Sequence, residues 1–180
     1  MAILKIARMG HPALLAPSQP VTDPTAAEIK RLARDMIETM IDADGAGLAA
    51  PQVHIPLRLV IFHAPASRSE DKGEEYAAPL TILANPSYEV LGTEKEGGWE
   101  GCLSAPGLRG YVERVTHLRY TGLDLDGRTI TREAKGFHAR VIQHECDHLD
   151  GVLYIKRVGD LSKLIFESEM RHWLEQDVEL

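Results

Sequence analysis

The spacing of apolar residues early in the chain predicts an amphipathic helix. Four of them recur every three or four positions, which places them on one helical face: Ile29, Leu32, Met36 and Met40. The preceding stretch Thr25–Glu28 has the Thr-x-x-Glu pattern of a capping box, which is typical of a helix start. We therefore expect a helix over residues 25–43 that ends before Gly45.

Branched apolar residues predict strands in the middle of the chain. Residues 57–63 have the composition of a buried strand, and strand patterns return at 80–91 and 111–125. Residues 65–79 between them are polar and bounded by prolines, so we expect a loop there. The pair Asp126-Gly127 is typical of a hairpin turn and leads into a further strand at 128–132.

Two further helices are expected in the last third of the chain. The first covers residues 136–149 and stops before Gly151, a residue type common after helix ends. The second covers residues 161–175, with Leu161, Leu164, Ile165 and Trp173 on or near one face. Because the strands cluster and do not alternate with helices, the pattern favours an α+β fold. We expect antiparallel or mixed strands around a central helix at 136–149, with N-terminal and C-terminal helices.

Composition and charge indicate which classes of protein the sequence fits. A length of 180 residues fits a single domain, residues 1–180, and 44% hydrophobic with 26% charged residues is ordinary for a globular protein. No apolar run is long enough to cross a bilayer, and the N-terminus lacks a signal-peptide pattern, so we expect a cytoplasmic protein without membrane association. The net charge of −7 argues against broad nucleic-acid binding.

The most informative short motif is His144-Glu-x-x-His148, within the predicted helix at 136–149. Four residues at 100° each bring the second imidazole to within about 40° of the first, roughly 6 Å along the axis. Both rings can then bind one metal ion, and Glu145 beside them can accept the proton of a water molecule. The motif therefore predicts a metal-dependent hydrolase.

The third metal ligand is open on the residues alone. A catalytic metal site commonly has three protein ligands and a water molecule. Downstream, where many metalloproteases have their third ligand, the chain offers His172 and the acidic residues of that region. Upstream, the segment Glu100–Ser104 offers Cys102, a strong soft ligand as a thiolate. Cys146 lies about 200° around the helix from His144, so we expect it to be a small buried hydrophobic residue.

Three segments of the chain resemble the signatures of the peptide deformylase family. They are Gly-x-Gly-x-Ala-Ala-x-Gln at 45–52, Glu-Gly-Cys-Leu-Ser at 100–104 and Gln-His-Glu-x-Asp-His-Leu-x-Gly at 143–151. All three are complete and in the family's order, and the resemblance spans roughly residues 3–170. It implies an enzyme that removes the formyl group from the N-terminal methionine of new polypeptides and releases formate.

The resemblance also implies a role for each site residue. The metal ligands would be Cys102, His144 and His148, with Glu145 as the proton carrier. The side-chain amide of Gln52 and the backbone N–H of Leu103 would stabilise the oxyanion. The substrate-binding residues would be Gly45, Gly47, Glu100, Arg109, Phe137 and Val141. Phe137 and Val141 share the face of His144 and are expected to line a methionine pocket, although plain core positions would fit them too.

Further predictions concern three residues in or beside the His-Glu-x-x-His motif, and Arg109. Gln143 and Asp147 have the position of groups that support metal ligands, and a carboxylate often orients a ligating imidazole. Arg140 stands where many relatives carry an apolar residue, so its charge must reach solvent or a carboxylate. Arg109 either closes one side of the pocket or holds a nearby carboxylate.

The expected cofactor is one divalent metal ion, and the family resemblance favours Fe²⁺, with Zn²⁺ or Ni²⁺ able to take its place.

The expected partners are N-formyl-methionyl nascent peptides, and a monomer is expected. Residues 160–180 contain two basic and six acidic residues, a balance of 2 − 6 = −4, so docking on ribosomal RNA through this tail is doubtful.

Two other functions compete with this interpretation. A metalloprotease that cuts internal peptide bonds would need a downstream third ligand and would leave Glu100–Ser104 without a role. A non-catalytic metal-binding relative would need neither Glu145 nor Gln52.

Overall fold

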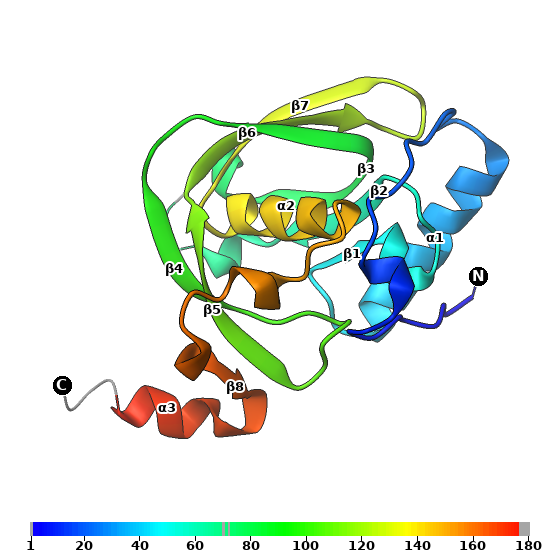
Figure 1. Cartoon of the computed structure of the whole chain (residues 1–180). Coiled ribbons are helices and arrows are strands. Elements are labelled where there is room, and N and C mark those ends of the chain that lie inside the picture. The colour runs from blue at the N-terminus through cyan, green and yellow to red at the C-terminus, as the bar shows by residue number, and fades with distance from the viewer. Residues whose placement is uncertain (1, 70, 72, 177–180) are drawn as a thin grey trace.

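A computed structural model describes residues 2–69, 71 and 73–176 of the chain (Figure 1). The larger sheet is antiparallel, with strand order β1-β2-β3-β6-β7. Its strands are β1 (Gly47–Ala49), β2 (Leu59–Ala64), β3 (Ala78–Val90), β6 (His117–Leu123) and β7 (Thr129–Lys135). The smaller sheet, also antiparallel, has the order β4-β5-β8, formed by Lys95–Glu100, Leu108–Val115 and Leu164–Phe166.

In the described part of the chain, three α-helices accompany the sheets: α1 (Ala27–Asp42), α2 (Gly136–Leu149) and α3 (Met170–Gln176). Figure 1 shows α2 in the middle of the molecule, with strands on several sides of it. Helix α2 contacts strands of both sheets, and its buried face joins a core with β2, β3 and β6 through Ala139, Ile142, Cys146 and Leu149. The expected α+β class with a central helix is confirmed.

The central helix has the predicted range, whereas other element boundaries differ from the predictions. The expected strand at 111–125 is two strands, because the chain turns at Thr116 and β6 pairs with β3 and β7 instead of continuing β5. The capping box at Thr25 was wrong. Helix α1 begins one residue later than that motif requires, and the Thr25 hydroxyl donates instead to Asp23, 2.7 Å away.

The predicted helix at 161–175 was also wrong. Residues Leu161–Lys163 form a short 3₁₀ turn in which Asp160 accepts a hydrogen bond from the backbone N–H of Ser162 at 2.9 Å. The chain then forms β8 on the edge of β5, and only the seven residues of α3 are α-helical. Residues 177–180, the end of the acidic tail, lie outside the described part of the chain. Within that described part, no helix has the length and apolar content needed to span a membrane.

His138 at the start of α2 gives the fold a pH-dependent stability. Its ring is fully buried beside Tyr120 and Phe62, with its Nδ1–H donating to the carbonyl oxygen of Glu75 at 2.9 Å. Burial lowers the pKa of His138 to about 4. In the unfolded chain the same imidazole binds a proton below about pH 6.5, so stability is lost as the pH falls from there toward 4.

We therefore predict that wild-type protein loses about 2 kcal/mol of unfolding free energy between pH 7.5 and pH 5 through His138 alone. His138→Gln keeps an N–H donor but does not titrate. The variant should therefore lose about 2 kcal/mol less unfolding free energy than wild type between pH 7.5 and pH 5. The comparison is made by urea denaturation at both pH values. His172→Gln, at a side chain that is 59% exposed, is the control and should behave as wild type. An equal pH dependence in His138→Gln and wild type would contradict the prediction.

Candidate active site

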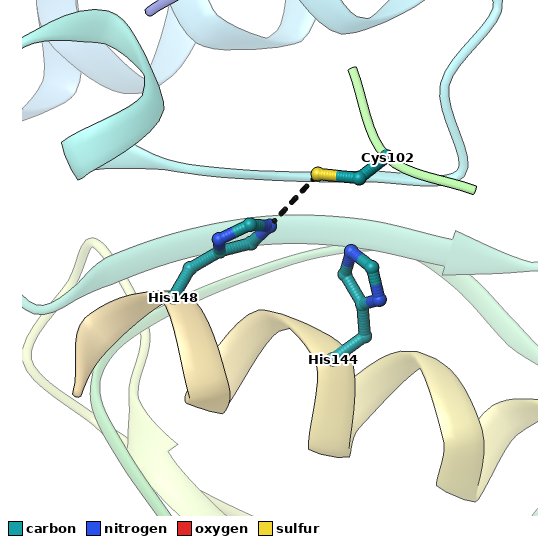
Figure 2. Close-up of side chains that lie close together, drawn as sticks. All are labelled: Cys102, His144 and His148. Atoms are coloured by element: carbon teal, nitrogen blue, oxygen red, sulfur yellow. Dashed lines mark hydrogen bonds between the residues drawn. The ribbon is translucent and has the colours of Figure 1, made fainter. Parts of the chain in front are cut away.

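One cysteine and two histidines converge beside α2 (Figure 2). His144 and His148 lie on successive turns of the helix, and Cys102 follows β4. The ligand atoms of the three residues all lie within 4.8 Å of one another, and the Sγ of Cys102 is 3.3 Å from the Nε2 of His148. A thiolate with two imidazoles is a donor set that suits Zn²⁺ or Fe²⁺, so these side chains fit a divalent metal ion.

The two cysteines of the chain have opposite environments. Burial opposes ionisation of Cys102, but His148 and His144 outweigh it and hold the pKa of the thiol well below its usual value. Cys146 is 5% exposed in the apolar core, and burial raises its pKa to about 12. The prediction that Cys146 is a small buried hydrophobic residue is confirmed. His172, the alternative third ligand, lies on α3 and outside the ligand cluster.

The carboxylate of Glu100 orients the ligand His144. Its Oε2 accepts a hydrogen bond from the Nδ1–H of His144 at 2.9 Å, which leaves Nε2 as the ring nitrogen available to a metal. Arg114 donates to both oxygens of Glu100, at 2.9 and 3.0 Å. Although burial opposes ionisation, these contacts lower the pKa of Glu100. A substrate-binding role for Glu100 does not fit, because both of its oxygens are already engaged and the residue is 5% exposed.

Asp147 does not orient an imidazole. Its carboxylate accepts hydrogen bonds from Arg114 at 2.7 Å and from Arg157 at 2.7 and 3.2 Å. The Nδ1 of His148 is buried and has no partner among the described residues. Arg114 therefore joins Glu100 to Asp147 inside the protein, a link for which the sequence offered no signal, since the three residues are far apart in the chain.

Gln143 and Arg140 connect α2 to the smaller sheet. The Gln143 amide pairs with the backbone of Val115, donating to its carbonyl at 2.9 Å, so Gln143 supports the helix and not a metal ligand. Arg140 donates to Glu100 at 2.9 Å and to backbone carbonyls of Val112 and Glu96 at 2.8 Å. The expectation that its charge reaches a carboxylate is confirmed.

Glu145 lies buried at the floor of a cleft with one oxygen unsatisfied. The residue is 3% exposed, and among the described residues none donates a hydrogen bond to its Oε2. Burial raises its pKa to about 7, although the neighbouring histidines oppose the shift. Gly47 lies directly against this carboxylate: a Cβ at Gly47 would be 2.6 Å from the Cδ of Glu145. A side chain at Gly47 would therefore displace the Glu145 carboxylate, which favours glycine at that position of β1.

The Gln52 amide is fixed beside the ligand cluster. Its Oε1 accepts a hydrogen bond from the backbone N–H of Ala49 at 2.8 Å, so its Nε2 points the other way. That nitrogen lies 3.1 Å from the hydroxyl of Ser104 and 3.5 Å from the sulfur of Cys102. The backbone N–H of Leu103 has no acceptor in the part of the chain that the structure describes. Gln52 and Leu103 therefore both bring an N–H donor to the cleft that Cys102 also lines.

A cleft of about 1010 Å³ opens above these groups. Most of the predicted site residues line it: Gly45, Gly47, Gln52, Glu100, Cys102, Leu103, Arg109, Phe137, Val141, His144 and Glu145. Phe137 and Val141 therefore have a cleft-lining position, while Val141 also belongs to the core. The Arg109 side chain holds a carboxylate, that of Glu167, which also lines the cleft.

The sequence and the fold both match known proteins. The family model for polypeptide deformylase matches residues 3–164. "Peptide deformylase 1" of Bordetella pertussis is 53% identical over 158 residues, which cover 88% of this chain and 89% of the relative. "Peptide deformylase 2" of Pseudomonas syringae is 51% identical over 170 residues, 93% of this chain and 94% of the relative.

Solved structures agree with these relatives. The crystal structure of peptide deformylase from Ehrlichia chaffeensis superimposes with a TM-score of 0.83 at 32% identity, covering 90% of this chain and 91% of that one. The enzyme from Synechococcus elongatus, solved in complex with actinonin, gives a TM-score of 0.78 at 36% identity, covering 91% of this chain and 82% of that one. The chain belongs to the peptide deformylase family, whose members are metal-dependent hydrolases.

Proposed function

We propose that this protein removes the formyl group from the N-terminal methionine of nascent polypeptides, with residues 1–180 acting as one catalytic domain. The observation that carries the proposal is the convergence of Cys102, His144 and His148 beside Glu145 at the floor of the cleft. A protease that relies on a downstream ligand does not fit this cluster, because His172 is outside it. A binding-only site would have no use for Glu145 or Gln52.

The chemistry divides between the metal and the residues around it. When bound by Cys102, His144 and His148, a divalent metal supplies Lewis acidity, which activates a water molecule and polarises the formyl oxygen. Glu145 takes the proton of the attacking water on its free oxygen and delivers it to the departing amine. The Gln52 Nε2 and the Leu103 N–H donate to the formyl oxygen as negative charge develops there.

The substrate-binding residues lie on two walls of the cleft. Strand β1 is an edge strand of the larger sheet, so the backbone at Gly47 is open to pairing with an extended peptide. Gly45 lines the same part of the cleft, but its N–H and its carbonyl are engaged by Met40 and His63. Phe137 and Val141 line the methionine pocket on the α2 side. Arg109 stands on the wall formed by the smaller sheet.

We propose Fe²⁺ as the cellular metal, with Zn²⁺ or Ni²⁺ able to occupy the same ligands, since a Cys-His-His set accepts each of them. The protein is expected to act as a cytoplasmic monomer on chains that are still being made. The C-terminal segment is acidic, which does not favour docking on ribosomal RNA.

The decisive test is formate release from a short N-formyl-methionyl peptide by protein purified without oxygen and loaded with Fe²⁺. The same peptide without its formyl group and an internally cleavable peptide are the controls. Rapid formate release without internal cleavage is the expected result. Internal cleavage would establish the protease instead, and metal-replete protein that releases no formate would be a non-catalytic relative.

Replacement of Gln52 by leucine tests the oxyanion role. We expect kcat to fall by a factor of about 10²–10³, with a smaller change in KM, because the lost N–H donor acts mainly in the transition state. Steady-state kinetics on the formyl peptide would measure both constants. Metal content must be measured in the same samples, since Gln52 also contacts Cys102. An unchanged kcat at full metal content would remove Gln52 from this role.

A further inference from the structure

The C-terminal arm, defined here as residues 161–176, is docked on the smaller sheet. Strand β8 continues the sheet through pairs such as Arg109↔Ile165. Beyond it, the ring of Trp173 packs edge-on against Trp99 of β4, with ring centroids 4.9 Å apart. The arm is therefore held in place at both of its ends, although Figure 1 shows α3 projecting from the body of the molecule.

This docking places Glu167 at the cleft. The residue directly follows β8, and its backbone N–H donates to the carbonyl oxygen of Gly107 at 2.8 Å. Its carboxylate accepts a hydrogen bond from the Nε of Arg109 at 3.1 Å and a second, short one from Nη2. Both side chains line the cleft, and both are partly exposed, Arg109 at 35% and Glu167 at 52%. The arm thus adds a negative charge to the active site.

Arg109 is fixed between this carboxylate and the metal-ligand loop. A Cβ added to Gly101 would lie 2.9 Å from the Cζ of Arg109, so the guanidinium rests on the backbone immediately before Cys102. Methionine occupies the floor of the cleft if the proposed function holds. The residues that follow it must then leave through the open part of the cleft, between β1 and the wall that carries Arg109 and Glu167.

We propose that Glu167 is a specificity-determining residue that sets the charge preference for the substrate residues after methionine, an inference that rests on the proposed function. With the carboxylate in place, the charge of Arg109 is neutralised, and its Nε and Nη2 donate to Glu167. Without it, Arg109 would present a free cation to the leaving peptide, and acidic side chains would bind better. The proposal gives the C-terminal arm a role in substrate choice.

The size of the effect follows from the exposure of the pair. Two charges a few ångströms apart at a protein surface interact far more weakly than in the interior, and salt screens them further. We expect a three- to ten-fold change in preference, on the order of that expected for one exposed ion pair. The contribution of the other charges that line the cleft is common to wild type and variant; these are Lys5, Arg8, Asp42, Asp44, Arg68, Glu100, Arg140 and Glu145.

The experiment compares kcat/KM on three formyl-methionyl peptides that carry alanine, aspartate or lysine at the second and third positions. In Glu167→Gln, the aspartate-to-alanine ratio should rise three- to ten-fold over wild type at low salt, and the lysine-to-alanine ratio should fall. The amide oxygen can still accept from Arg109, so the arm is expected to stay docked. Glu169→Gln removes the same charge from an exposed position two residues later and should leave both ratios unchanged.

Variants at Arg109 test whether the change in charge preference comes from the Arg109–Glu167 pair. Arg109→Gln leaves the Glu167 carboxylate unpaired and should lower the aspartate-to-alanine ratio, whereas the double variant Arg109→Gln/Glu167→Gln should return it toward the wild-type value. In Glu167→Gln alone the gain should shrink in 0.5 M salt. An unchanged ratio, or an equal loss on all three peptides, would overturn the proposal while leaving deformylation intact. Failure of wild-type protein to release formate from any peptide would instead overturn the proposed function.

Discussion

Replacing Glu145 with glutamine is expected to lower kcat for deformylation by a factor of about 10²–10⁴ or more, the range for loss of a general base. The side chain is buried and has one oxygen without a partner among the described residues. Glutamine has the same size and fits beside Gly47, but its amide cannot accept and return a proton. The ligands themselves are unchanged, so metal content should stay at the wild-type level.

Formate release and metal analysis on the same Glu145→Gln samples test this prediction. Glu113→Gln is the matched control, because it removes a carboxylate of the same type from an exposed position on β5 and should turn over like wild type. Near-normal turnover in Glu145→Gln would show that another group carries the proton. Loss of metal from the variant would assign Glu145 to the metal site and not to proton transfer.

The central helix could be predicted from sequence because its signals are local. Helical spacing and a terminal glycine predict the range of α2, the shared face of His144 and His148, and the buried position of Cys146 on another side of the helix. The third ligand was different: the residues alone allowed Cys102 or His172, and only the family resemblance favoured Cys102. In the structure the segment after β4 lies beside the helix, and the group that could hold a metal contains Cys102 and not His172.

Features that depend on distant partners could not be predicted. Strand β4 has a polar, glycine-rich sequence without a strand pattern, and it forms because β5 pairs with it. The apolar spacing of the C-terminal arm is compatible with a helix, but the open edge of β5 takes Leu164–Phe166 as a strand. The same limit applies to the Glu100 carboxylate, whose link to His144 and Arg114 exists only after the sheets enclose α2.

The two cysteines provide the sharpest test of the metal site. Cys102→Ala removes one of three converging ligands. Loss of a residue that only hydrogen-bonds to a ligand lowers metal affinity about 10- to 100-fold, so we expect a larger fall here. Formate release should fall with it to near background. Cys146→Ala removes the same atoms from the opposite side of α2, within the apolar core, and should keep its metal and its turnover while losing about 1 kcal/mol of stability.

Both variants are compared after anaerobic purification, by metal analysis, formate release and urea denaturation. The comparison separates metal ligation from packing. Replacing a thiol that only packs in the core lowers stability and leaves metal affinity intact. If Cys102→Ala kept its metal and its activity, the third ligand would have to come from elsewhere, and a protease-like site would return to consideration. If Cys146→Ala lost its metal while remaining folded, the assignment of Cys146 to the core alone would be wrong, because a residue that only packs in the core does not affect metal binding.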